Sequence, residues 1–241
     1  MKQFKFSLLA ATALFAATVT TAQTVDDIIA KHTEAMGGAD KISQVNSMYI
    51  ESSVQAMGSE SPNTTTILNG KGYKSESEMM GSKIVQVYTD KGGWMINPMM
   101  GASAATPMDD DMYNSGEEQV YTAGGLNDYV AKGSKAELQG QEKTGDINAW
   151  KIKLTNKANI ETIYYLDPAT YYIIQIVKQI NMMGQSMDLT INLSDYRKTD
   201  EGILIPYTTD INYGGQFSMT STIKKVEVNK TIDPAIFEMP K

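Results

Sequence analysis

The sequence predicts a mainly β fold built on a broad antiparallel sheet with one apolar face. Between residues 149 and 228, every second residue of successive segments is apolar, as in Trp150-Ile152-Leu154 and Leu189-Ile191-Leu193. This period of two is typical of half-buried strands. Short turns of Gly, Asn, Asp and Pro separate the segments, and such turns join antiparallel neighbours. The chain offers too little helix to cover this face, so the sheet either closes into a barrel or encloses a cavity for an apolar molecule.

Residues 1–22 have the features of an export signal. Lys2 and Lys5 precede an apolar run over residues 6–19, and small residues end at Ala22. We expect cleavage after Ala22, so that Gln23 begins a periplasmic mature chain. The apolar run is too short for a stable membrane span, and an uncleaved N-terminal anchor is the less favoured alternative. Residues 23–241 contain no Pro- or Ser-rich linker and are expected to form a single domain.

Composition narrows the function further. The chain has no Cys, so neither disulfides nor thiolate chemistry are available. The formal net charge is −7, and it becomes two units more negative when the signal lysines are removed. A negative balance of this size argues against nucleic acid and anionic lipid headgroups as binding surfaces. We expect a monomer that binds neither nucleic acid nor a cofactor.

The mature chain is predicted to begin with a helix. Thr24 and Asp27 resemble a capping box, apolar residues follow at helical spacing up to Met36, and Gly37-Gly38 ends the helix. Alternating segments separated by turn residues then predict strands. The early strands are expected at residues 45–56, 63–69, 72–79, 83–89 and 93–97.

The segment from Pro98 to Gly125 interrupts this rhythm. Its first part is an aperiodic stretch of Met, Ala and Gly, and a helix is then predicted over Pro107–Tyr121, with Thr106 as its cap. Glycines on its C-terminal side suggest a movable cover rather than ordinary sheet. The later strands are expected at residues 135–141, 149–155, 161–167, 171–180, 186–196, 203–213 and 216–228.

Few residues could support catalysis or bind a metal. His32 is the single histidine and lies on the apolar stripe of the first helix, which favours a packed structural role over a catalytic one. Zinc would need nitrogen or sulfur ligands that the chain lacks, and no metal site is expected. The Asp109–Asp111 run matches a calcium loop poorly and fits the first turn of a helix better. Asp195 and Arg197 are expected to form a surface ion pair, and acid/base chemistry from carboxylates that meet in space stays open.

The 16 methionines are more informative, because several cluster around the interruption. Unbranched thioethers adapt to ligands of variable shape, although a single Met more often fills an irregular core. We expect Trp94 to border the cavity mouth, with a core anchor as an equal alternative. The residues expected to line the cavity or its lid are Met48, Ile50, Val54, Trp94, Ile96, Met99, Met108, Met112, Val120, Trp150, Ile152, Leu189 and Ile191.

Several stretches together resemble the outer-membrane lipoprotein-sorting protein group of the LolA-like superfamily. They are residues 84–98 (IVQVYTDKGGWMINP), 26–31 with 37–41, 194–197 (SDYR), and 226–229 with 233–240. Each stretch is short, but together they span essentially the whole mature chain.

The resemblance implies an unclosed, strongly curled antiparallel β half-barrel with helices over its concave, apolar face. Proteins of this superfamily use such cavities to carry acyl chains of lipoproteins or lipids across the periplasm. The segments 24–36 and 107–121 would be the covers here. The lipoprotein carrier has an arginine in an early strand that helps to hold its lid, whereas the single arginine of this chain is Arg197, near the end of a late strand. Direct equivalence to that carrier is therefore not implied.

These observations predict a non-enzymatic periplasmic carrier of an acyl chain or another apolar ligand, in lipoprotein or lipid sorting to the outer membrane. Its partners would be an acylated lipoprotein or lipid and, for delivery, an outer-membrane receptor or an inner-membrane export complex. One alternative is an envelope scaffold or receptor whose curved sheet docks another protein. The other is a hydrolase with carboxylates at the cavity mouth.

Overall fold

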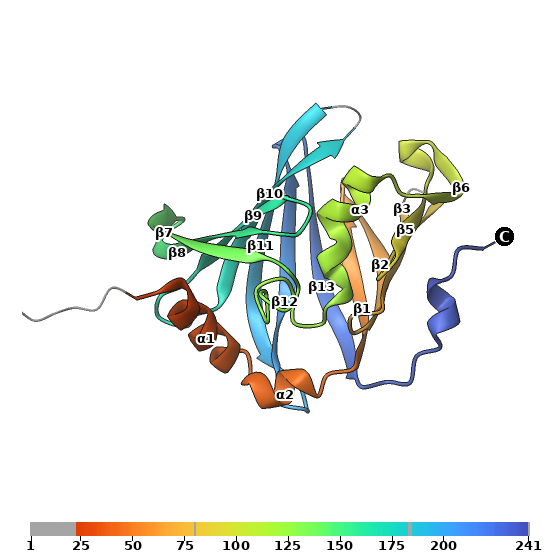
Figure 1. Cartoon of the computed structure of the whole chain (residues 1–241). Helices are drawn as coiled ribbons and strands as arrows, with labels where there is room; N and C mark the ends of the chain where they lie inside the picture. Colours follow the sequence, from red (N-terminus) through yellow and green to blue (C-terminus); the bar gives the residue numbers. More distant parts are fainter. Residues whose placement is uncertain (1–22, 80, 183–184, 241) are drawn as a thin grey trace, which may run out of the picture.

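A single 13-stranded antiparallel sheet dominates the computed structural model, which describes residues 23–79, 81–182 and 185–240. The strands lie in the order β6-β5-β4-β3-β2-β1-β13-β12-β11-β10-β9-β8-β7. In the described part of the chain, the edge strands β6 and β7 do not pair with each other, so the sheet is curled but not closed (Figure 1). The prediction of a mainly β half-barrel is confirmed. The expected export signal, residues 1–22, lies outside the described residues.

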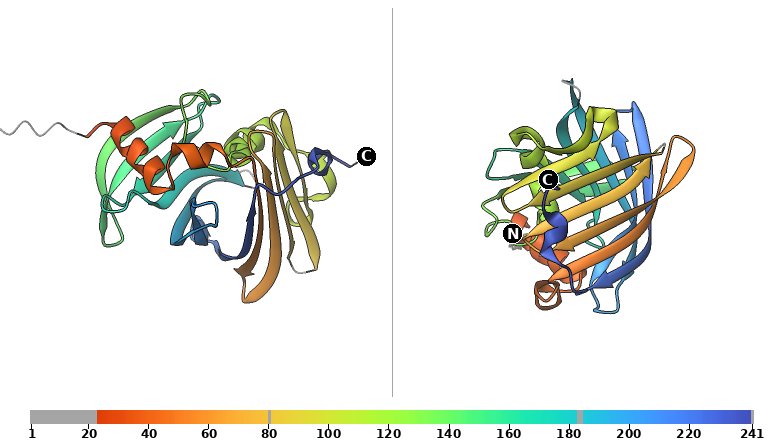
Figure 2. Two further views of the ribbon diagram at one scale, coloured as in Figure 1. Left: turned by 90° about the horizontal axis from the view of Figure 1, so that it is seen from below. Right: turned by 90° about the vertical axis from the view of Figure 1, so that its right-hand side faces the viewer.

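The sheet consists of two meanders, β1–β6 and β7–β13, joined in its middle. The strands are β1 Ser47–Ala56, β2 Ser59–Leu68, β3 Gly72–Met79, β4 Ser82–Thr89, β5 Gly92–Asn97, β6 Ala102–Pro107, β7 Lys135–Thr144, β8 Ile147–Thr155, β9 Glu161–Leu166, β10 Ile173–Met182, β11 Gln185–Lys198, β12 Leu204–Tyr213 and β13 Phe217–Val228. β1 pairs with β13, with Met48 opposite Val228 and Ala56 opposite Met219. The two meanders are inclined to each other and form the walls of a trough (Figure 2).

Helical segments cover the concave side. They are α1 Val25–Ala35, α2 Ala39–Ser43, η1 Pro98–Met100, α3 Asp110–Gly116 and η2 Glu117–Val120. The capping box predicted for α1 is present, with the Thr24 hydroxyl accepting from the Asp27 amide and the Asp27 carboxylate accepting from the Thr24 amide. The short helix α2 was not predicted, because its five residues carry no apolar stripe.

The second cover begins later than predicted. Residues 102–107 form an edge strand, in which Thr106 pairs with Met95 and Pro107 with Trp94. Asp109, rather than Thr106, caps α3 and accepts a hydrogen bond from the Met112 amide at 2.8 Å. An edge strand tolerates Pro107 because its outer side needs no ladder hydrogen bond. Asp110 and Asp111 lie in the first turn of α3, as predicted for partners of the helix dipole.

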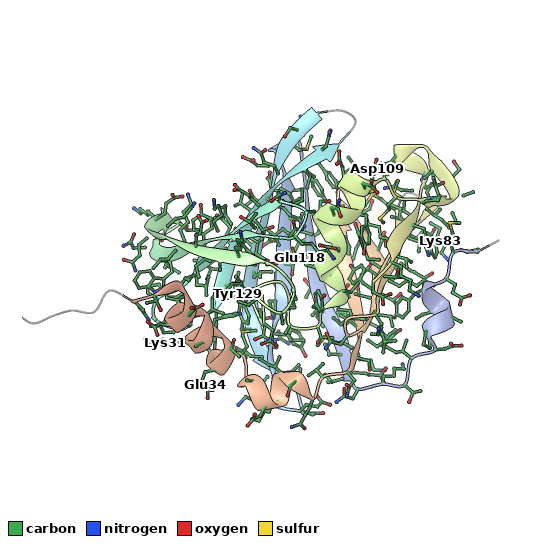
Figure 3. All side chains as sticks on the ribbon, in the orientation of Figure 1. Lys31, Glu34, Lys83, Asp109, Glu118 and Tyr129 are labelled. Atoms are coloured by element: carbon green, nitrogen blue, oxygen red, sulfur yellow. The ribbon has the colours of Figure 1, made fainter. Side chains whose placement is uncertain are left out.

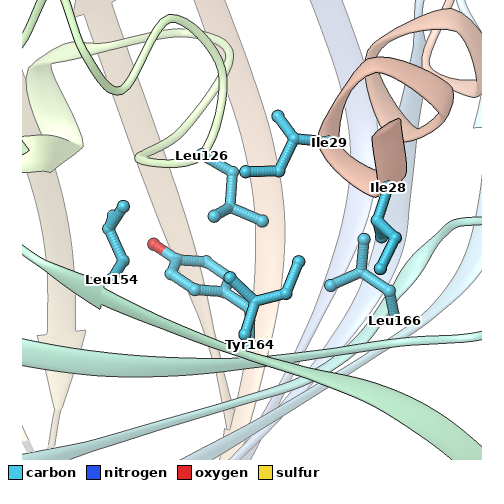
Figure 4. Packing of buried hydrophobic residues seen from close by; sticks show 7 residues of the cluster. Ile28, Ile29, Leu126, Leu154, Tyr164 and Leu166 are labelled. Carbon is cyan, nitrogen blue, oxygen red and sulfur yellow. The ribbon is translucent and has the colours of Figure 1, made fainter. Parts of the chain in front are cut away.

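The largest core cluster lies beneath α1. Ile28 and Ile29 from α1 pack against Leu126 and against strand residues of β8 and β9 (Figure 4). The fully enclosed side chains of this cluster include Ile28, Ile152 and Leu166. Burial of each such side chain contributes about 1.5–3 kcal/mol, so α1 is an integral part of the folded core.

The outer face of β3–β5 has its own cover. The C-terminal segment crosses this face and includes η3, Pro234–Phe237 (Figure 2, right). Phe237 packs on Gly72, where any side chain would overlap its ring, and forms a buried cluster with Val85, Val87 and Trp94. The Trp94 indole N–H donates to the Phe237 carbonyl at 2.9 Å. Both faces of these strands are therefore covered.

Candidate ligand cavity

A cavity of about 1530 Å³ lies between the concave face of the sheet and its helical covers. Residues of β1–β5 and β9–β13, of α1 and of the α3–η2 segment line it. This volume exceeds the roughly 300–1,000 Å³ that is usual for small-molecule sites. The lining differs between the two meanders, being aliphatic on β10–β13 and rich in hydroxyl groups on β1–β4.

The aliphatic wall consists of the inward-facing apolar residues of β10–β13. Its members are Ile176, Ile180, Leu189, Ile191, Leu193, Ile205, Ile211, Met219 and Ile223. The strand register places Ile191 opposite Ile176 on one side and Ile211 on the other, and Ile211 opposite Met219. Because most of these side chains are half-buried, their apolar surface faces the cavity. Ligand burial against this wall would yield roughly 25 cal/mol per Å² of apolar surface.

The hydroxyl wall consists of the inward-facing polar residues of β1–β4. Its members are Ser52, Asn63, Thr65, Tyr73, Ser75, Ser77 and Gln86. Asn63 is its centre, donating to the Ser52 and Thr65 hydroxyls and accepting from Ser75. The period-two pattern did not reveal this wall, since apolar residues alternate poorly along β2 and β3.

The α3–η2 segment lies over the cavity and is held by hydrogen bonds together with the packing of Gly116 and Val120. The Tyr113 hydroxyl donates to the Thr89 carbonyl at 2.8 Å, and the Lys178 ammonium donates to the Ser115 carbonyl at 2.9 Å. Gly116 rests against the Tyr88 ring, so closely that a Cβ there would lie 2.5 Å from ring atoms. The cover thus contacts both walls, through β4 and through β10.

The charged groups of the cavity belong mostly to this cover. Figure 3 shows Asp109 at one end of the α3–η2 segment and Glu118 nearer the middle of the molecule. Glu118 lies 3.9 Å from the Lys178 ammonium and accepts from the Tyr164 hydroxyl at 3.4 Å. Burial, followed by the nearby Glu118 carboxylate, raises the pKa of Tyr164 well above its ordinary value. Asp109 is used as the cap of α3, so these carboxylates have structural partners.

The loop after η2 is anchored to the first cover. Thr33 donates to the Asn127 side chain at 3.0 Å, and the Tyr129 hydroxyl donates to Asp26 at 2.7 Å. Lys132 donates to the Gly124 carbonyl at 2.7 Å, and burial lowers the pKa of its ammonium to about 8. This loop therefore extends the core beneath α1.

His32 lies at the cavity edge but is only 4% exposed. Its Nδ1 is 2.8 Å from the Tyr171 carbonyl, which accepts from the ring N–H. Burial lowers the pKa of His32, and the hydrogen bond to Tyr171 opposes this shift. A ring that is packed and anchored in this way fits the predicted structural role.

The structure brings some of the predicted cavity residues together and separates others. Those that line the cavity are Ile50, Val54, Met99, Met112, Leu189 and Ile191. Trp94 and Ile96 belong instead to the outer cluster under the C-terminal segment. The predicted cavity position is therefore wrong for Ile96, and Trp94 has its alternative role, that of a core anchor. The cavity-facing residues of β5 are Met95 and Asn97, one position out of step with the prediction.

The remaining predicted residues lie in packed regions beside the cavity. Met48 is buried in a cluster with Val45, Ile67 and Ile203. Trp150 and Ile152 belong to the cluster beneath α1. Met108 precedes α3 and packs on Gly93, and Val120 is buried where its carbonyl accepts from the Gly70 amide. The prediction that these five residues contact a ligand is therefore wrong, and they support the cavity through packing instead.

Within residues 23–79, 81–182 and 185–240, no group of three or more His, Asp or Glu side chains is placed to hold a metal ion. Over the same residues, no helix combines the length and apolar character needed to cross a membrane. The Asp195–Arg197 ion pair, with 2.6 Å between carboxylate and guanidinium, is exposed as predicted.

Comparison with known proteins identifies the fold. Neither a family model nor a curated protein sequence matches this chain. A DUF1329 family protein from Desulfovibrio piger is 14% identical, with a TM-score of 0.58, over 90% of this chain and 98% of the other. An outer membrane lipoprotein-sorting protein domain from Vibrio parahaemolyticus is 12% identical, with a TM-score of 0.57, over 88% and 94%. A LolA superfamily protein from Nitrosomonas europaea is 10% identical, with a TM-score of 0.59, over 90% and 98%. At these identities the likeness shows the fold, and the predicted resemblance is confirmed at that level.

Proposed function

We propose that this chain, which has the fold of LolA superfamily proteins, is a non-enzymatic periplasmic carrier of acyl chains in lipid or lipoprotein sorting. The observation that supports this most directly is the cavity of about 1530 Å³ with its aliphatic wall. A sixteen-carbon chain buried there would gain roughly 12 kcal/mol, at about 0.8 kcal/mol per methylene, before ordering costs. That is enough for useful binding with later release. An acylated lipoprotein or a free lipid would be its partner.

The α3–η2 segment would serve as the lid of this carrier. Its cavity side presents Met112, while its backbone and polar side chains bond to the rims of both walls. Opening would exchange these hydrogen bonds for bonds to water, at a net cost of only about 1 kcal/mol each. Val120 is the buried apolar residue of this segment, so opening would expose little apolar surface beyond that side chain.

Mass spectrometry of lipid extracted from protein purified without detergent tests the proposal. We expect a copurifying acyl lipid in the wild type and at least about tenfold less in Met112→Asp, because a charge would face the chain. Met239→Asp changes an exposed methionine of the C-terminal segment and is the matched control. Circular dichroism must show that both variants keep the fold. Absence of lipid from the wild type, together with no binding of added acyl lipid, would reject the carrier function.

A further inference from the structure

The hydroxyl wall forms a continuous polar patch across three neighbouring strands. The strand register places Ser52 opposite Asn63 and Asn63 opposite Ser77. The next row of the same face places Thr65 opposite Ser75. All these side chains line the cavity, and Ser52 is only 7% exposed. A bare alkyl chain against this patch would remove hydroxyl groups from water without giving them partners, which is unfavourable.

The hydrogen bonds within the patch leave donors that face the cavity. Both amide protons of Asn63 are used, since they go to the Ser52 and Thr65 hydroxyls at 3.2 Å each. The Ser75 hydroxyl donates to the Asn63 carbonyl oxygen at 2.9 Å. Ser52 therefore accepts from Asn63, and its own proton has no acceptor among the hydrogen bonds of the described residues. The Tyr73 hydroxyl, beside Ser75 and Thr65, adds another polar group at the same place.

The patch carries no ionised group. The lysines and glutamates of β3, such as Lys74 and Glu76, pair with each other on the opposite face of the sheet. A carboxylate or phosphate would find no countercharge on this wall. A neutral acceptor, such as an ester or amide carbonyl, would accept from the hydroxyls at no such cost.

We propose that the hydroxyl wall binds the uncharged carbonyl linkage of the ligand, an acyl ester or amide, while the chains extend over the aliphatic wall. This inference rests on the proposed function and assigns the orientation and chemical class of its ligand. Ser52 donates to the carbonyl oxygen, the Thr65 hydroxyl completes the polar surface beside it, and Asn63 holds both hydroxyls in place. The same linkage occurs in free acylglycerols and in the lipid anchor of acylated proteins.

Two probes that differ only at the carbonyl test this inference. 1-Monopalmitoylglycerol has an ester where 1-O-hexadecylglycerol has an ether, and each is used to displace the apolar dye 1-N-phenylnaphthylamine from the full mature chain. We expect the ester to bind about fivefold more tightly to the wild type, as one or two hydrogen bonds would give. In Ser52→Ala/Thr65→Val, the two probes should bind equally, while the dye binds as before.

The matched control is Ser53→Ala/Thr64→Val, which removes the same groups from neighbouring positions that face the other side of the sheet. It should keep the preference for the ester. Equal binding of ester and ether to the wild type overturns the inference alone, whereas failure of dye and both lipids to bind overturns the carrier function as well. Dipalmitoylglycerol and an S-dipalmitoylglyceryl-cysteinyl peptide, compared in the same assay, then distinguish the free lipid from the protein anchor as the source.

Discussion

The two covers of the concave face, α1 and the α3–η2 segment, are held by different forces. α1 inserts Ile28 and Ile29 into the core, where they are 0% and 7% exposed. In the α3–η2 segment the buried residues are Gly116 and Val120, and hydrogen bonds to Thr89 and Lys178 hold the segment as well. Apolar burial is lost when a segment detaches, whereas hydrogen bonds are replaced by bonds to water. α1 is therefore part of the main core, whereas α3–η2 buries fewer apolar side chains and depends more on hydrogen bonds.

The largest expected effect that separates the two covers is on stability. Ile28→Ala removes a fully buried side chain beneath α1 and should lower the free energy of unfolding by about 2–5 kcal/mol. Met112→Ala truncates a half-buried side chain on α3 and should cost less than about 1 kcal/mol. Urea unfolding followed by circular dichroism measures both values. Similar losses in the two variants would show that both covers belong to one core.

Hydrogen exchange should show the same difference without mutation. The amides of α3–η2 should exchange at least about tenfold faster than those of α1, because this segment buries fewer apolar side chains than α1 does. Addition of 1-monopalmitoylglycerol should slow exchange in α3–η2 more than in α1 or the central strands. Exchange as slow as in β12, unchanged by lipid, would make the segment a fixed plug and favour the scaffold alternative.

A smaller effect concerns pH and belongs to α1. Burial lowers the pKa of His32 in the folded chain below its ordinary value of 6.5, so the unfolded chain binds the proton more readily. The contribution of His32 to stability is therefore constant above about pH 7.5 and falls as the pH drops through 6.5, by at most about 1.4 kcal/mol between pH 7.5 and 5.5. Urea unfolding at the two pH values measures the loss. His32→Gln should remove this dependence, since His32 is the single histidine of the chain. A variant with the same pH dependence would assign the loss to other groups.

The later strands could be predicted to within a few residues, because apolar residues on one face of the sheet alternate with polar residues on the other. β11 and β12 have water on one side and the cavity on the other, so Leu189 and Ile191 alternate with polar residues. In β5 this rule fails. Trp94 and Met95 are both buried, one under the C-terminal segment and the other at the cavity, so apolar residues occur on both faces. Nothing local in the sequence shows that residues 232–237 return to cover the outer face.

The start of α3 shows a second limit of the sequence. Thr106-Pro107 and Asp109 are both sound helix starts, and only the pairing of β6 with β5 decides between them. Residues 102–105 have weak strand propensity and become a strand because the edge of β5 is available. The hydroxyl wall could not be predicted either, since Ser52 and Asn63 form a polar cluster only when the strand register places them side by side. Long-range pairing, rather than local pattern, positions these parts of the site.

The pairing of β1 with β13 affects the order in which the protein folds. The first strand of the sheet lies beside the last, and the two walls of the trough meet only there. Each meander can form from hairpins of neighbouring strands during synthesis. The pairing of the two meanders requires contacts between residues far apart in the sequence, such as Met48 and Val228. Before β13 is synthesised, the two meanders are not joined, and the cavity between them is not formed. The cavity between the two walls is therefore completed in one step, when β13 pairs with β1.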